Sequence, residues 1–170
     1  MGYGLPAALG AAVALKGKRV ICLDGDGSVQ MNIQELQTII HNNLNIKLFW
    51  LNNDGYHSIR QTQKKIFKSR FCGVNESSGI SFPSAKKIAK AYGFEFVRID
   101  SLTSIDNRLD KVLSKKGPVL CEVVLDPQQQ FSPKLSSKSL PDGTMISPSL
   151  EDMFPFLSEE EMKANTYKEA

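Results

Sequence analysis

Short apolar runs rich in β-forming residues alternate along this chain with segments whose apolar residues recur at helical spacing. The runs at 20–23 and 48–51 predict two strands. Between them, residues 32–40 carry apolar side chains at 33, 36, 39 and 40, which predicts a helix. This order is that of a βαβ unit, whose crossover makes the two strands parallel.

The alternation continues to residue 125. Beyond the first unit, the pattern predicts a small-residue helix at 7–15, a short irregular helix at 56–67, a loop at 69–81, a helix at 84–92, a strand at 95–99, a helix at 102–113 and a strand at 118–125. Gly93 would stop the helix that precedes it. Strands and helices in strict alternation predict an α/β fold: a parallel sheet with helices on both faces.

One acidic and one amide side chain follow the first two predicted strands. Asp26 lies in the run Gly-Asp-Gly-Ser after the strand at 20–23, and Asn53 follows the strand at 48–51. Parallel strands joined by a crossover end at the same edge of the sheet, where open α/β sheets bind ligands. We therefore expect two hard oxygen ligands to converge there, as Mg²⁺ requires when it is shared with phosphates.

The Gly25-Asp26-Gly27-Ser28 run also suits a bulky anion. Its glycines allow backbone to approach closely and to take positive φ. Amides at the start of a following helix favour negative charge, and the Ser28 hydroxyl can donate to a phosphate oxygen. The alternative is a plain turn at Asp26-Gly27, with Ser28 as a helix cap. The spacing to Asn53 favours a metal-bridged diphosphate site.

These motifs resemble a known family. The strings MGYGLPAA, GDGSVQMNIQELQTI and LNNDGYHSIRQTQ are similar to the C-terminal, diphosphate-binding domain of acetolactate-synthase-like, thiamine-diphosphate-dependent enzymes. The resemblance implies thiamine diphosphate and Mg²⁺ as cofactors and a 2-keto acid as substrate. It implies metal ligation by Asp26, Asn53 and the carbonyl of Gly55. The implied cofactor-binding residues are Met1, Gly25, Gly27, Ser28, Tyr56, His57 and Ser58.

No catalytic residue follows from the sequence. His57 is a candidate, because histidine exchanges protons near neutral pH; the alternative is an exposed loop residue. In the family, a glutamate of a separate pyrimidine-binding domain activates the cofactor, and we find no counterpart of that domain in the 170 residues. The resemblance therefore implies a pyrimidine-binding domain or subunit as partner, and a homo- or hetero-oligomer.

The sequence divides at residue 125. We expect residues 1–125 to form the diphosphate-binding domain, N-terminally truncated because no strand precedes the helix at 7–15. Residues 126–170 are polar and end in a short helix capped at Ser158-Glu161. This segment is either a disordered tail or a lid over the cofactor.

Composition excludes several classes of protein. A net charge of +3 is too small to indicate nucleic-acid binding, and no apolar run approaches the length of a membrane span. The three cysteines lack metal-ligand spacing, which favours a reducing, cytoplasmic setting. A basic cluster is interpreted as a solvated surface, or as a steering surface for an anionic substrate; it comprises Arg60, Lys64, Lys65, Lys68 and Arg70.

Three functions remain after these exclusions. The first is the cofactor domain of a 2-keto-acid decarboxylase or carboligase that is inactive without its pyrimidine-binding domain. The second is a non-catalytic cofactor-binding remnant or a regulatory partner. The third, a generic nucleotide-binding domain, is disfavoured because the Gly25–Ser28 run matches neither the GxGxxG nor the GxxxxGK[ST] motif.

Overall fold

The computed structural model describes residues 1–166, which fall into two compact units. The first unit is Met1–Gln128 and the second is Gln129–Ala170, of which the last four residues lie outside the description. Each unit is described by itself below. None of the helices in the described residues is long and apolar enough to cross a membrane.

The first unit is built on a four-stranded sheet in which every neighbouring pair is parallel. Its strands are β1 (Val20–Gly25), β2 (Ile46–Asn52), β3 (Glu95–Ile99) and β4 (Val119–Val124). Their spatial order is β1-β2-β4-β3, so β2 and β4 are the central strands. All four carboxyl ends therefore lie at one edge of the sheet, as the sequence predicted for the first two strands.

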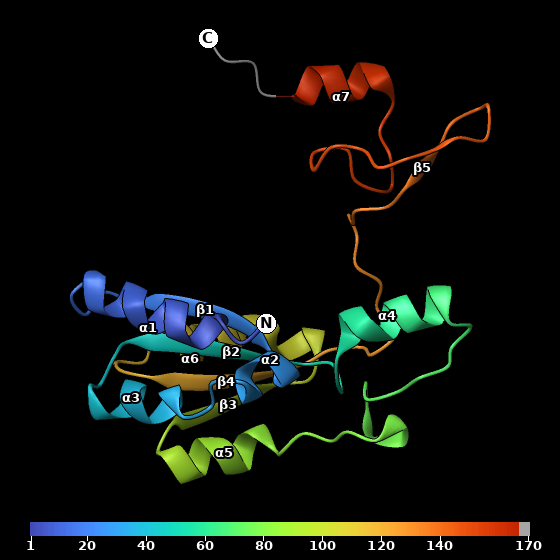
Figure 1. Cartoon of the computed structure of the whole chain (residues 1–170). Helices are drawn as coiled ribbons and strands as arrows, with labels where there is room; N and C mark the ends of the chain where they lie inside the picture. Colours follow the sequence, from blue (N-terminus) through green and yellow to red (C-terminus); the bar gives the residue numbers. More distant parts are fainter. Residues whose placement is uncertain (167–170) are drawn as a thin grey trace. The chain divides into compact units, whose positions relative to one another are not determined.

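Helices cover both faces of this sheet, which confirms the α/β prediction (Figure 1). One face packs against α1 (Gly4–Ala14), α3 (Glu35–His41) and α5 (Ala85–Tyr92). Trp50 of β2 is fully buried among them. The other face packs against α6 (Ile105–Ser114), where Val112 is buried. Small residues such as Ala8 and Ala12 let α1 approach the sheet closely.

The remaining helices surround the carboxyl edge or precede α6. They are α2 (Asp26–Gln30), α4 (His57–Ile66) and the 3-10 helices η1 (Glu76–Ser78) and η2 (Leu102–Ser104). Figure 1 shows α2 and α4 at the same end of the sheet. α2 begins immediately after β1, and α4 begins five residues after the end of β2.

Three helix predictions need correction. The helix expected at 32–40 begins only at Glu35, because residues 31–34 form turns after α2. The segment expected as an irregular helix at 56–67 is a regular α-helix, α4. The helix expected at 102–113 does not include Leu102, which lies in η2 with 85% of its surface exposed. The helix that packs on the sheet starts at Ile105.

The second unit contains a short antiparallel ribbon and a terminal helix. The ribbon pairs β5 (Lys138–Ser139) with β6 (Met145–Ile146). Phe154 and Phe156 stack edge to face with ring centroids 5.7 Å apart, and the Lys138 ammonium lies 5.1 Å from the Phe156 ring. The helix α7 (Glu159–Asn165) begins at Ser158, whose hydroxyl accepts from the Glu161 amide at 3.2 Å. That this unit acts as a lid stays a prediction.

Candidate functional site

Strand register brings the two motif segments together. Gly25, the last residue of β1, is aligned with Leu51 of the parallel neighbour β2. Asp26 and Asn53 follow these aligned positions by one and two residues. The crossover therefore places a carboxylate and an amide side chain at the same edge of the sheet, which is what the spacing of the motifs indicated.

Asp26 is buried, with 3% of its surface exposed. Its Oδ1 accepts from the Gly27 amide at 2.7 Å, and its Oδ2 accepts from the Gly55 amide at 3.1 Å. Burial raises the pKa of the Asp26 carboxyl, although these backbone hydrogen bonds act in the opposite direction. A buried carboxylate held by neutral amides is an acceptor whose negative charge a cation can neutralise.

Asn53 supplies a second oxygen. Its Oδ1 is buried and has no hydrogen-bond partner among the described residues. A buried acceptor without a partner is uncommon, and a missing ion is one of its ordinary explanations. The chemistry of this donor set, a carboxylate and a free amide oxygen, fits Mg²⁺. No group of three His, Cys, Asp or Glu residues that could hold a metal occurs within residues 1–166. A metal held here would therefore need ligands besides these side chains, such as backbone carbonyl or phosphate oxygens.

The backbone after Asn53 is tightly constrained. Asp54 and Gly55 both have positive φ, +58° and +126°. A Cβ at Gly55 would lie 1.9 Å from the Val74 carbonyl oxygen, which also accepts from the Tyr56 amide at 3.0 Å. Only glycine fits this position. We call residues Asn53–Gly55 the metal loop.

Gly27 is required for a different close approach. A Cβ there would lie 2.3 Å from Cε1 of the Tyr56 ring. That ring packs edge to face on Phe82, with centroids 5.3 Å apart. Tyr56 thus joins the Gly25–Ser28 run to the segment before α5, a role that the sequence did not indicate.

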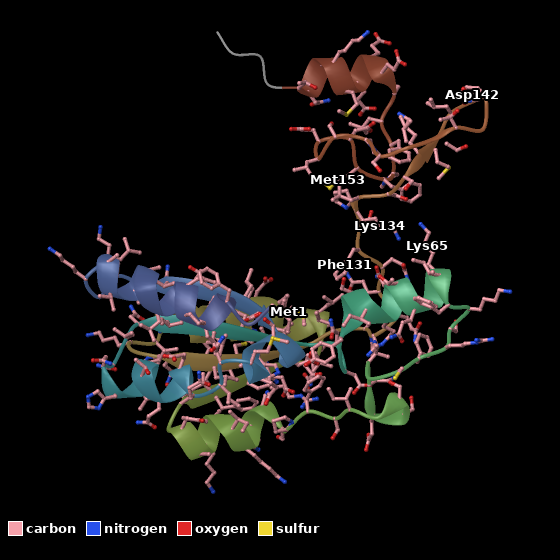
Figure 2. All side chains as sticks on the ribbon, in the orientation of Figure 1. Met1, Lys65, Phe131, Lys134, Asp142 and Met153 are labelled. Carbon is pink, nitrogen blue, oxygen red and sulfur yellow. The ribbon has the colours of Figure 1, made fainter. Side chains whose placement is uncertain are left out.

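Ser28 is joined to the N-terminal segment. Its Oγ accepts from the Gly2 amide at 2.8 Å, and the Gly2 carbonyl accepts from Asn32 Nδ2 at 2.6 Å. Because Oγ is the acceptor in this bond, its own hydrogen stays available for a phosphate oxygen. Met1 is 75% exposed beside this segment and is labelled in Figure 2. Asn32 was not singled out from sequence.

His57 and Ser58 occupy the first turn of α4. His57 is buried, so it is not an exposed loop residue, and its Nε2 lies 2.9 Å from Nε2 of Gln61. Ser58 is exposed, and its carbonyl accepts from Thr62 at 3.2 Å. His57 and Ser58 stand one and two residues beyond Tyr56.

The basic cluster was wrongly interpreted as solvated at one position. Arg60 is 8% exposed, and its guanidinium donates to backbone carbonyls of the metal loop. The other four members are exposed, and Lys65 projects outward from the end of α4 in Figure 2. A buried arginine cannot be told from an exposed one by charge pattern alone.

A small hollow of about 140 Å³ adjoins Asp26 on the side of α5. It is lined by Asp26, Trp50, Asn52, Asp54, Phe82, Pro83, Ser84 and Glu122. Glu122 is buried, and its two oxygens accept from Asn52 Nδ2 at 2.8 Å and from Arg98 Nη1 at 3.1 Å. Asp26, Asp54 and Glu122 contribute three carboxylates to this lining, and the charge of Glu122 is paired with Arg98.

Comparison with known proteins agrees with this geometry. Residues 1–123 match the family described as thiamine pyrophosphate enzyme, C-terminal TPP binding domain. The chain belongs to this family. The matched residues include both strand ends that carry Asp26 and Asn53, and the whole four-stranded sheet of this TPP-binding domain up to Val123.

Curated relatives of the domain are acetolactate synthases. It is 34% identical to the acetolactate synthase large subunit of Cyanidium caldarium over 136 residues, 80% of the chain. It is 40% identical to acetolactate synthase of Arthrospira platensis over 123 residues, 72% of the chain. It is 34% identical to acetolactate synthase isozyme 2 large subunit of Escherichia coli (strain K12) over 153 residues, 90% of the chain. These alignments cover 23%, 21% and 26% of the three relatives' lengths.

Proposed function

We propose that this domain binds thiamine diphosphate through a Mg²⁺ ion held by Asp26, Asn53 and Gly55. The observation that carries the proposal is the buried Oδ1 of Asn53, which has no hydrogen-bond partner within residues 1–166, at the same sheet edge as the buried Asp26 carboxylate. The two side chains supply two oxygen ligands, and the Gly55 carbonyl would supply a third. Diphosphate oxygens would supply further ligands.

The phosphate side of the site rests on the Gly25–Ser28 run. Gly27 keeps the segment free of a side chain where the Tyr56 ring approaches. Ser28 has a hydroxyl hydrogen to donate, since Gly2 holds its oxygen. We assign anion binding to these groups and cation binding to Asp26, Asn53 and Gly55, because each ion favours surroundings of the opposite charge.

The reaction that we propose is the decarboxylation of a 2-keto acid, followed by carbon–carbon bond formation or release of an aldehyde. Support comes from the relatives, which are named acetolactate synthases. When bound, thiamine diphosphate supplies the carbanion chemistry. The residues of this chain bind the diphosphate end, orient the cofactor and exclude water around Asp26.

A partner domain is part of the proposal. Edge strand β1 exposes Ile21 and Leu23, at 52% and 67%, on the face that α1 does not cover. Met1 and Tyr3 are 75% and 76% exposed next to the site. Apolar side chains left exposed on an uncovered sheet face and next to a ligand site are typical of an interface. We propose that a pyrimidine-binding domain or subunit covers part of this surface and completes the active site.

Calorimetric titration with thiamine diphosphate, with and without Mg²⁺, tests the proposal. We expect binding to the 170-residue chain only when Mg²⁺ is present, and loss of that binding in Asp26→Ala. The matched control is Asp110→Ala, which removes an exposed aspartate from α6. Equal affinity with and without Mg²⁺, or binding by Asp26→Ala as tight as in the unchanged chain, would refute the metal bridge.

A further inference from the structure

Arg60 connects the metal loop to two other parts of the domain. From the first turns of α4, its Nη1 donates to the carbonyls of Asn53 at 3.2 Å and Pro127 at 3.1 Å. Its Nη2 donates to the carbonyl of Asp54. One guanidinium thus holds two successive carbonyls of the metal loop and ties them to the chain that follows β4.

The charge on Arg60 makes this arrangement unusual. Arg60 is only 8% exposed. No carboxylate within residues 1–166 forms an ion pair with it. A buried cation costs free energy unless it is paired or extensively hydrogen bonded. Three carbonyls offset part of that cost. A neutral residue at this position would avoid the rest of it, but it would leave those carbonyls without a donor.

The buried charge of opposite sign lies across the same loop. The Gly55 amide donates to Asp26 Oδ2, and Nη2 of Arg60 is 3.0 Å from the point where a Gly55 Cβ would stand. Gly55 is therefore enclosed by the Asp26 carboxylate on its amide side and by the guanidinium on its other side. The two groups together fix both ends of the Asp54–Gly55 peptide.

These hydrogen bonds stabilise the metal loop, whose backbone conformation is rare for residues other than glycine. Asp54 has φ +58° without being glycine. Positive φ at an ordinary residue costs free energy and persists only where surrounding contacts impose it. The planar fork of arginine can bond several carbonyls at once, whereas a lysine ammonium is a single point of charge.

We infer that Arg60 is the positioning residue of the metal site: it fixes the Asn53–Gly55 backbone so that the Asn53 side chain and the Gly55 carbonyl face the metal. Arg60 acts through the loop and touches neither metal nor substrate. The inference has two parts. The effect of Arg60 on cofactor binding rests on the proposed function. The effect of Arg60 on the conformation of the metal loop does not depend on any ligand.

Two measurements on the full chain separate these halves. The first is hydrogen exchange of the Gly55 amide without ligand, with the β1 amide of Cys22 as internal reference. The second is the Mg²⁺ concentration that gives half-maximal binding of thiamine diphosphate. The variants are Arg60→Met, which removes charge and donors, and Arg60→Lys, which keeps the charge. The matched control is Lys64→Met, one turn further along α4 and exposed.

We expect Arg60→Met to speed Gly55 exchange by about tenfold or more while Cys22 exchange is unchanged. The half-maximal Mg²⁺ concentration should rise by roughly 10- to 100-fold, as for other residues that support a metal ligand. Arg60→Lys should fall between the unchanged chain and Arg60→Met in both measurements. Lys64→Met should match the unchanged chain in both.

The inference would be overturned if Arg60→Met lowered the melting temperature but left the Gly55 exchange rate and the half-maximal Mg²⁺ concentration unchanged. Arg60 would then stabilise the domain as a whole and not the metal loop in particular. If Arg60→Met fails to fold, Arg60→Lys decides the matter by the same two measurements. Should the unchanged chain bind no thiamine diphosphate, the proposed function fails, and Gly55 exchange alone still supports or overturns the hold on the loop.

Discussion

The Gly55 amide donates to Oδ2 of Asp26 at 3.1 Å, across 29 residues of sequence. This bond joins the two motif segments directly, so neither can shift at the sheet edge without the other. The geometry of the metal loop is therefore the property on which the site depends most, and it is open to mutational tests.

Gly55→Ala should be strongly destabilising. Its Cβ would lie 1.9 Å from the Val74 carbonyl oxygen, and its φ of +126° disfavours any side chain. Strain and overpacking together should lower the free energy of unfolding by about 2–4 kcal/mol in urea denaturation. Gly10→Ala is the control, since no atom of the described residues that could clash lies within 4 Å of its Cβ position in α1. That variant should be neutral or more stable by about 0.5–1 kcal/mol. Equal losses in both variants would contradict the prediction.

Gly27→Ala should act through Tyr56. The new methyl group would lie 2.3 Å from Cε1 of the tyrosine ring, which must then leave its edge-to-face contact with Phe82. We expect a loss of about 1–3 kcal/mol in the free energy of unfolding. In the Tyr56→Ala background the same change should cost less, with a coupling energy of at least ~0.5 kcal/mol in a double-mutant cycle. Additive losses would show that Gly27 and Tyr56 do not interact.

Glu122→Gln should destabilise the sheet more than a surface substitution of the same kind. Glu122 is buried and accepts from both Asn52 and Arg98. Replacing its charge weakens two charge-assisted hydrogen bonds, with an expected loss of about 1–3 kcal/mol in thermal or urea unfolding. Glu95→Gln is the control: its pair with Lys115 is 2.6 Å long but solvent-exposed, so the loss should stay under ~1 kcal/mol. A larger loss at Glu95 would reverse this ranking.

The three cysteines should differ sharply in reactivity. Burial raises the pKa of the Cys22 and Cys121 thiols to about 11, whereas Cys72 is exposed. Since the thiolate is the nucleophile, only about one in a thousand of the buried thiols would be ionised at pH 8. A thiol-specific colorimetric reagent should therefore label one cysteine rapidly in the folded chain and the other two only after denaturation. Rapid labelling that persists in Cys72→Ser would contradict this assignment.

The sequence by itself determined the α/β class and the edge of the sheet at which the segments of Asp26 and Asn53 meet. Strand positions followed from apolar runs such as 48–51, because central parallel strands are buried on both faces. The convergence of Asp26 and Asn53 followed from topology, since a crossover returns both strand ends to one edge. These inferences use only local patterning and a general rule of chain connection, which is why one sequence sufficed.

Only the tertiary structure decided which polar side chains are buried and which groups they form hydrogen bonds with. Arg60 belongs to a basic stretch that resembles a solvated surface, yet one of its acceptors, the Pro127 carbonyl, is 67 residues away. Glu122 lies in a strand whose burial was predictable, but its partners come from β2 and β3. The metal loop depends on the same kind of distant contact, at Val74 and at Asp26. Charge pattern and periodicity describe neighbours along the chain. The partners of a buried charged side chain are groups that only folding brings together.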